Sequence, residues 1–440
     1  MQVSVEEVNT TRRKLAVEVP VEQVSSEIDR AFGRVQQHAH IKGFRQGRVP
    51  RAILEKYFGE QVRAEVLSHL IEHSFADAIQ QSGLRPVGNP EIVPESIAPG
   101  SPLRYQATVD VLPEIRIAEA SGIAAKRPVR EVVDADVERA LTDVRESLAE
   151  LRPIEDRTQP ARGDFAVLDY SAKLEGEEAG EPRKENRMVE VGANAMPPEI
   201  DLALQSMSVG QTRTVGVTYP TEGADAKVAG KTVEFEIVLR GLREKVLPPI
   251  DDDLAREHGD AETLDELRAK LRERISASVR HAAEEQVRDQ LVDALLEKNA
   301  FDVPKSMIDR QTESLANDLF RNARGADALR GDEAAMTKLK DELRPRAERQ
   351  VRAALALETL AKQENIEVTD NDVDARVETL AAQAGEHAER LRAAYRKEEV
   401  REELQARLVR ERALEWIVEH AAIEDVVVPA DVVAPPDATR

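Results

Sequence analysis

The chain has 440 residues, a formal net charge of −22 and no cysteine. Hydrophobic residues make up 41% of it, charged residues 33% and aromatic residues 3%, which is typical of a soluble, helix-rich protein. Its length is too great for one ordinary core and predicts two to four domains. The absence of cysteine excludes disulfides, thiolate catalysis and zinc–thiolate sites. The acidity disfavours nucleic-acid binding over the whole surface, although it permits a local basic patch that contacts phosphate.

The beginning of the chain, MQVSVEEVNTTRRKLAVEV, lacks the basic segment followed by an apolar run that marks a signal peptide. No window in the sequence reaches the roughly eighteen apolar residues that a membrane-spanning helix needs. We therefore expect a cytoplasmic protein without a membrane partner.

Residues 1–112 are expected to form a compact α+β domain. In QVSVEEV and RKLAVEVP, apolar and polar residues alternate, which predicts antiparallel strands with one buried face. Apolar residues recur at helical spacing on both sides of the loop 41–50, which predicts a helix on each side. The segment RYQATVDVLP is predicted to form a further strand. Gly59 is expected to end a short helix, and a longer helix then runs to Gly83. The loop is thus the tip of a helix–loop–helix.

Residues 113–151 contain an extended stretch and an amphipathic helix that is expected to pack on the C-terminal domain. Residues 152–245 are richer in Gly and Pro, and their alternating runs predict four or five strands around one helix. The strand runs are DFAVLDYSAKL, QTRTVGVTYP and KTVEFEIVLRGL, and the helix is PPEIDLALQSM. A second small α+β domain is therefore predicted.

Residues 246–425 are predicted to be mainly helical. Only four Gly and two Pro occur between 250 and 425, and Thr263 with Glu266 predicts a capping box at a helix start. The tail 426–440 has no periodicity and is expected to be disordered. The fold class is multidomain α+β.

The histidines do not cluster at the spacing of metal ligands. His69 and His73 lie four residues apart on one predicted helix, as two ligands could, but no third ligand is evident nearby. Ordinary surface or partly buried histidines are the expected outcome, with no metal site. The sequence has no Gly-rich phosphate loop, no Walker motif and no GxSxG elbow, so no cofactor and no ATP-driven chemistry are expected.

The loop IKGFRQGRVP is the strongest candidate for a binding site. From Lys42 to Arg63 there are six basic residues and two Glu, a local charge of +4 in an acidic chain. Such a patch contacts phosphate without reading sequence, and its binding is sensitive to salt. The alternative is a solvated turn with scattered charge. Phe44 favours a binding site, because an aromatic side chain on a Gly-flanked tip has no helix face to pack into.

GFRQGRVP resembles the GFRxGxxP signature of the trigger factor family of bacterial ribosome-associated chaperones. The order of segments is similar over nearly the whole chain, including the long helices that follow FDVPKSMID. The resemblance implies an N-terminal α+β ribosome-binding domain and an FKBP-like α+β domain inserted midway. It further implies a mainly α-helical C-terminal chaperone domain with arms.

The resemblance implies that the loop docks on the large ribosomal subunit beside the exit of the nascent chain, where it contacts a ribosomal protein and rRNA. The positions that match the signature are Gly43, Phe44, Arg45, Gly47 and Pro50. Gln46 departs from the family, in which a basic residue is common at this position. Lys42 and Arg48 are expected to supply positive charge in its place.

RGDFAVLDYSAKLEGEEAGE and YPTEGADAKVAGKTVEFEIVLRGL resemble FKBP-type peptidyl-prolyl isomerases. Such a domain needs no nucleophile, because an apolar pocket that favours the twisted imide lowers a rotational barrier of about 18–20 kcal/mol. The resemblance places Tyr170, Met196 and Phe235 in this pocket. Aromatic rings that are usual in the family are absent at or near Ala179, Glu199, Ile200 and Gly223. We therefore expect weak isomerase activity, and a domain that serves only as a binding module is the alternative.

The resemblance also implies an ATP-independent chaperone that holds nascent and unfolded polypeptides open and assists folding and protein export. It further suggests a homodimer that hides the loop. One alternative is a ribosome-independent helical chaperone of the cell-envelope isomerase type, which requires an export signal that the sequence does not show. Another is a structural coiled coil, which requires a sustained heptad that the Gly- and Pro-rich middle third does not support.

Overall fold

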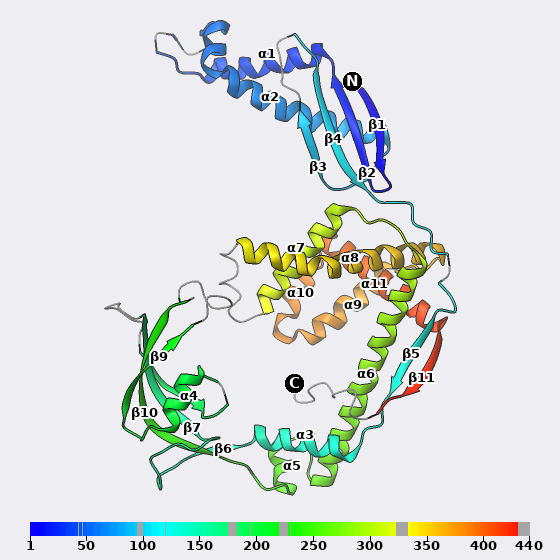
Figure 1. Ribbon diagram of the computed structural model, residues 1–440. Coiled ribbons are helices and arrows are strands. Elements are labelled where there is room, and N and C mark those ends of the chain that lie inside the picture. The colour runs from blue at the N-terminus through cyan, green and yellow to red at the C-terminus, as the bar shows by residue number, and fades with distance from the viewer. Residues whose placement is uncertain are drawn as a thin grey trace. The chain divides into compact units, whose positions relative to one another are not determined.

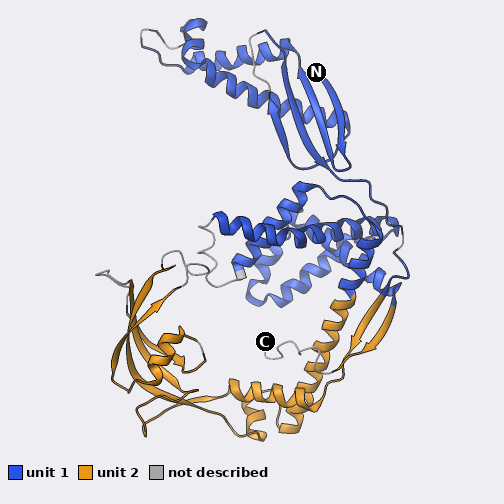
Figure 2. Ribbon diagram, in the orientation of Figure 1, with its two compact units in different colours: residues 1–124, 288–422 blue, residues 125–287, 423–440 orange. Residues whose placement is uncertain are grey.

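The computed structural model describes the chain except residues 43, 46, 95–99, 119, 175–182, 194, 220–227, 229, 323–332 and 430–440. The described chain divides into two compact units, one of residues 1–124 and 288–422 and the other of residues 125–287 and 423–440 (Figure 2). Helix α6 contributes to both units. In the part of the chain that is described, we find no helix that has both the length and the apolar character needed to cross a membrane.

The first unit begins with an antiparallel sheet and two long helices (Figure 1). The strands are β1 (Gln2–Asn9), β2 (Arg12–Val19), β3 (Pro86–Pro94) and β4 (Leu103–Val111), in the order β1-β2-β4-β3. Alternate residues of β2 and β4 are buried, as the sequence pattern predicted, and Val17 pairs with Tyr105. This buried face packs against α1 (Val21–His38) and α2 (Arg51–Ser82) in one hydrophobic core.

The predicted helix break at Gly59 was wrong. α2 is continuous and ends where Gly83 takes the left-handed conformation, with φ +65°. Gly59 is buried inside the helix, and the buried stripe that starts at Leu54 continues beyond it through Val62. A glycine costs roughly 1 kcal/mol in a helix interior, and tertiary packing of the apolar stripe outweighs that preference.

The middle of the chain forms a five-stranded antiparallel sheet with one short helix beside it (Figure 1). Its elements are β6 (Glu150–Pro153), β7 (Phe165–Leu174), β8 (Lys184–Glu190), α4 (Pro198–Gln205), β9 (Thr212–Thr218) and β10 (Thr232–Val246). The long strand β10 pairs with β6, β7 and β9. The sheet therefore starts at Glu150, two residues before the boundary expected at 152. A single hydrophobic core joins the sheet to α4.

The second unit also contains a helical cluster. Its members are α3 (Asp134–Ser147), α5 (Asp252–His258) and the first half of α6 (Leu264–Lys298), which share one core. At the start of α6 the backbone N–H of Glu266 donates to Thr263 Oγ1 at 3.3 Å, as expected. The Glu266 carboxylate accepts from the N–H of Glu262 at 3.1 Å, so the two residues form half of the predicted capping box.

Strands β5 (Ala124–Val129) and β11 (Ala422–Val427) form a separate two-stranded sheet. The disordered tail was expected to start at residue 426, but β11 ends only at Val427. Residues 426 and 427 are thus part of a strand, which corrects that expectation at its first two positions. Residues 430–440 lie outside the described residues.

The helical part of the first unit confirms the predicted mainly helical character after residue 250. Its elements are α7 (Lys305–Asn322), α8 (Glu333–Gln363), α9 (Asp370–Gln383), a 3-10 turn (Gly385–His387), α10 (Ala388–Ala394) and α11 (Glu398–Glu419). α7 and α8 pack together around Ala316 and Phe320. Arg410 of α11 pairs with Glu358 of α8 at 2.7 Å. A mainly helical C-terminal part and two α+β parts make up the predicted fold class.

Candidate functional site: an exposed loop and an apolar cluster

The loop between α1 and α2 is built from two tight turns. The N–H of Phe44 donates to the carbonyl of Ile41 at 3.1 Å, and the N–H of Arg48 donates to the carbonyl of Arg45 at 3.0 Å. Gly47 adopts φ +76°, a conformation that side chains with a Cβ rarely take. The glycine in the second turn of the motif is therefore required by the backbone. Gly43 and Gln46 lie outside the described residues.

The base of the loop is fixed to the helix pair. Val49 is fully buried in the hydrophobic core, and the Gln36 side-chain amide donates to its carbonyl at 2.8 Å. Pro50 caps the start of α2 with φ −61°, the value that its ring imposes. In the first turn of α2, the guanidinium of Arg51 lies 3.7 Å from the centre of the Phe32 ring. The tip is thus held at a defined place on a rigid support.

The tip presents an aromatic side chain among cations. Phe44 remains 41% exposed, and Lys42, Arg45 and Arg48 are all exposed. Among the described residues, none of these three cations takes part in a salt bridge, whereas Arg51 pairs with Asp29 at 3.2 Å and with Glu55 at 3.0 Å. The charges at the tip are therefore available to an external partner. The structure brings together all the described residues that the sequence predicted for this site.

The three residues predicted for the isomerase pocket lie in one hydrophobic cluster. Phe235 is buried, and Tyr170 and Met196 are half-buried against the same core. The ring centres of Tyr170 and Phe235 are 6.3 Å apart, with planes inclined by 47°. Ile200, one of the positions without a ring, is fully buried on α4, and Glu199 is exposed. Ala179 and Gly223 lie outside the described residues.

Next to Tyr170, a buried carboxylate that sequence reasoning missed holds three segments together. Asp169 accepts a hydrogen bond from the N–H of Asn186 at 2.9 Å, from Arg240 Nε at 2.7 Å and from Arg183 at 3.3 Å. These donors, with the Asn186 N–H first and then Arg240, hold the pKa of Asp169 below its usual range. The signal was an Asp inside the apolar run VLDY. Its role is to fix β7, which carries Tyr170, against β8 and β10.

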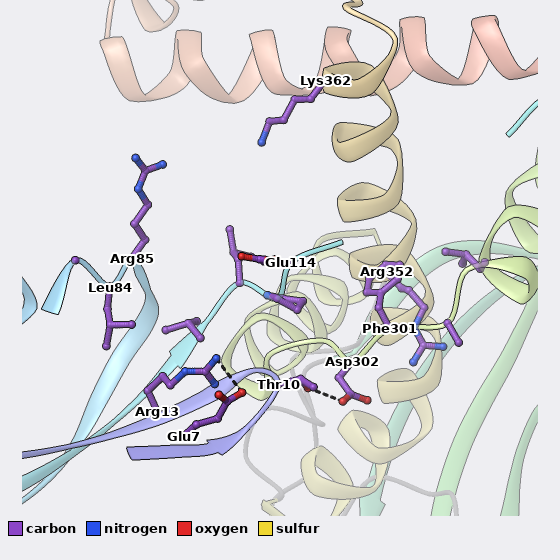
Figure 3. Close-up of a pocket in the computed structure, with 16 residues that line it drawn as sticks. Glu7, Thr10, Arg13, Leu84, Arg85, Glu114, Phe301, Asp302, Arg352 and Lys362 are labelled. Carbon is purple, nitrogen blue, oxygen red and sulfur yellow. Dashed lines mark hydrogen bonds and ion pairs between the residues drawn. The ribbon is translucent and has the colours of Figure 1, made fainter. Parts of the chain in front are cut away.

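A cavity of about 1260 Å³ lies within the first unit, where the ends of β1 and β4 meet the segment before α7 (Figure 3). Its lining mixes apolar residues such as Leu112 and Phe301 with charges of both signs. Thr10 Oγ1 donates to Asp302 at 2.6 Å across it, and Arg13 pairs with Glu7 at 3.1 Å. A lining of this kind suits weak, adaptable contacts with a polypeptide rather than a small, tightly bound ligand.

Comparison with known proteins assigns all three parts of the chain. Residues 1–144 match the family model "Bacterial trigger factor protein (TF)", and residues 263–419 match "Bacterial trigger factor protein (TF) C-terminus". Residues 156–240 match "FKBP-type peptidyl-prolyl cis-trans isomerase". Because both terminal parts match trigger factor models, a ribosome-independent chaperone of the cell-envelope type is not favoured.

Similar proteins cover nearly the whole length of the chain. The chain is 32% identical over 430 residues to the trigger factor of Geobacter sp. (strain M21), covering 97% of this chain and 99% of that protein. It is 33% identical over 428 residues to that of Anaeromyxobacter sp. (strain Fw109-5), covering 96% and 100%. A solved structure titled "Promiscuous Substrate Recognition in Folding and Assembly Activities of the Trigger Factor Chaperone" is 23% identical, with a TM-score of 0.49 over 95% of this chain and 99% of that one. The chain therefore belongs to the bacterial trigger factor family, the ribosome-associated chaperones that carry an FKBP-type peptidyl-prolyl isomerase domain.

Proposed function

We propose that this chain binds the ribosome through the tip of the loop between α1 and α2, with Phe44 as the apolar anchor and Lys42, Arg45 and Arg48 as the cations. The observation that carries this assignment is the exposed Phe44 on a tip whose cations have no salt bridge among the described residues. Gly47 and Pro50 shape the turn, and Gly43 belongs to the same motif.

The chemistry of the tip supports two kinds of contact on the ribosome. Exposed guanidinium and ammonium groups bind rRNA phosphate, and an exposed ring fits an apolar depression on a ribosomal protein. We place the contact beside the exit of the nascent chain on the large subunit. We also propose that the protein is cytoplasmic and that it forms a homodimer in which the loop is hidden.

Co-sedimentation with bacterial ribosomes over a series of salt concentrations tests this assignment. The variant is Phe44→Ala/Arg45→Ala, and the matched control is Leu202→Ala/Arg187→Ala, which also removes one exposed apolar side chain and one exposed cation. We expect saturable, salt-sensitive binding by the wild type and the control, and loss of binding in the loop variant. Equal binding by all three proteins would refute the assignment to the loop.

In the middle domain, we propose that Tyr170, Met196 and Phe235 form the prolyl-binding wall and that catalysis is weak. The support is their common hydrophobic cluster, together with the aliphatic Ile200 in the region where the family usually has a ring. An apolar wall desolvates the imide and favours its twisted state, but fewer rings offer less contact area to proline. The test is the rate of proline isomerisation in a model peptide, measured by NMR exchange spectroscopy. Activity equal to that of an aromatic-rich FKBP domain would contradict the proposed weakness.

We also propose that unfolded clients contact the mixed apolar and charged lining of the cavity beside Leu112 and Phe301. Leu112 is 47% exposed there, and the neighbouring charges have both signs. Such a surface holds an extended chain weakly enough to release it without ATP. An aggregation assay with an unfolded client tests the site. It compares the Leu112→Ser variant with Leu202→Ser, a control in the middle domain. We expect the first variant alone to lose protection.

A further inference from the structure

α2 carries two histidines whose rings face each other across one helical turn. His69 Nε2 and His73 Nε2 are 3.2 Å apart, and the ring centres are 4.4 Å apart in an edge-to-face arrangement with planes at 61°. Both side chains are exposed. In the absence of any other ligand, one ring donates its Nε2 proton to the other. The two histidines that are four residues apart in the sequence are thus in direct contact through two nitrogens that could bind a metal ion.

This separation of the two nitrogens also suits a metal ion. Zinc–imidazole bonds are about 2.0–2.1 Å long, so a metal bound to both nitrogens would see them at an angle of about 100°, close to tetrahedral. Metal binding needs the donor ring to move its proton from Nε2 to Nδ1, so that both neutral rings offer an unprotonated Nε2 to the ion. Neutral imidazole nitrogen is a ligand for zinc, nickel and copper ions, whereas magnesium and calcium prefer oxygen.

The surroundings leave room for the rest of the coordination shell. A cavity of about 510 Å³ between α1 and α2 is lined by both histidines and by the carboxylates of Glu27 and Asp77. Arg30, which also lines it, pairs with Glu27 at 2.6 Å. Within the described part of the chain, no group of three or more His, Cys, Asp or Glu residues is placed to hold a metal ion. Water would therefore fill the remaining positions, with the carboxylates as acceptors for its hydrogens.

We propose that His69 and His73 form a two-histidine binding site for one divalent cation of the zinc, nickel and copper class. Binding cross-links two successive turns of α2 and therefore stabilises the N-terminal domain in proportion to metal occupancy. The site is independent of the assignment of the loop tip to the ribosome.

Isothermal titration of the metal-free full-length protein with zinc chloride tests the site. The variants are His69→Gln, His73→Gln and the double substitution Ser68→His/His69→Ser, which keeps the imidazole but moves it to a neighbouring position on α2. Positions 68 and 73 point about 140° apart around a helix, so they cannot chelate one ion. The matched control is His281→Gln on α6, which also removes one exposed histidine.

We expect one zinc ion per wild-type chain and per His281→Gln chain, and at least a tenfold loss of affinity in the three α2 variants. Cobalt bound in place of zinc should give a visible absorption band in the same two proteins only, which separates binding from misfolding. Equal affinity in all five proteins would place the metal elsewhere and overturn the proposal. Absence of binding to the wild type at millimolar zinc would overturn it as well.

Discussion

The carboxylate of Asp110, at the end of β4, accepts a hydrogen bond from the backbone N–H of Ser306 in the first turn of α7 at 2.9 Å. The same carboxylate binds Arg12 Nε at 3.1 Å, and Ser306 Oγ donates to the carbonyl of Val87 at 3.1 Å. Burial raises the pKa of Asp110, but the Ser306 and Arg12 hydrogen bonds outweigh it and hold the pKa below its usual range. The Asp110 carboxylate thus caps the N-terminus of α7 from a distant part of the chain. It accepts from an N–H that has no hydrogen-bond partner within the helix.

Replacing this cap should loosen the start of α7. Asp110→Ala removes the acceptor from a partly buried N–H, a change that costs about 1 kcal/mol or more. We expect amide hydrogen exchange at Ser306 to accelerate by roughly tenfold or more, since 1.4 kcal/mol corresponds to a factor of about ten. Asp110→Asn keeps an acceptor oxygen and is the control, with most of the protection retained. Unchanged exchange in Asp110→Ala would show that the hydrogen bond does not hold this turn.

Phe44 and Arg45 of the loop should contribute differently to ribosome binding. Arg45→Ala is expected to weaken binding and to reduce the slope of log affinity against log salt by about one, because one phosphate contact is lost. Phe44→Ala is expected to weaken binding with the slope unchanged, because an apolar contact releases no counterions. Co-sedimentation of each single variant over a salt series measures both quantities. Equal slopes for wild type and Arg45→Ala would exclude a phosphate contact by Arg45.

Removing the ring at position 170 should reduce isomerase activity. We expect Tyr170→Ala to lower kcat/KM on a proline peptide by roughly tenfold, since the half-buried ring supplies much of the aromatic wall beside Phe235. Tyr170→Phe keeps the ring and should stay within about twofold of the wild type. Leu202→Ala, at a 66% exposed position on α4, is the control outside the cluster. Thermal unfolding of each variant shows whether lost activity reflects a lost fold.

The N-terminus of α9 gives a stability term that depends on pH. Arg412 donates to Asp372 Oδ1 at 2.6 Å, and the N–H of Thr369 donates to Oδ2 at 2.8 Å. These bonds, Arg412 first, lower the pKa of Asp372 from 3.8 to about 2. Because the folded pKa lies below the unfolded one, the contribution of this carboxylate is complete above about pH 4. It is lost as the pH falls through about 2.

The contribution of the Asp372 carboxylate to stability is the difference in unfolding free energy between the wild type and Asp372→Asn. Urea unfolding at several pH values between 7 and 2 measures it. The wild type should be the more stable protein at neutral pH, and the difference should shrink between about pH 4 and pH 2. Arg412→Gln removes the main cause of the shift and should flatten this dependence. A difference that stays constant down to pH 2 would contradict the assignment.

The sequence alone determined most of the elements and the loop motif, because these depend on neighbours along the chain. The alternation in β2 and β4, the stop at Gly83 and the mainly helical character after residue 250 follow from short-range periodicity and backbone preference. The exposed tip was predictable from an aromatic residue among glycines and cations. The break expected at Gly59 failed because a buried stripe outweighed local preference.

Only the tertiary structure decided which distant groups meet. Asp110 and Ser306 are 196 residues apart in the chain, and Asp169 and Arg240 are 71 apart. The histidine spacing on α2 was visible in the sequence, but the 3.2 Å contact depends on side-chain rotamers. A pattern in the sequence reports which face of an element is apolar. It carries no information on the partner of a polar group, because that partner is set by how the folded segments pack and by the cost of leaving a buried donor or acceptor unpaired.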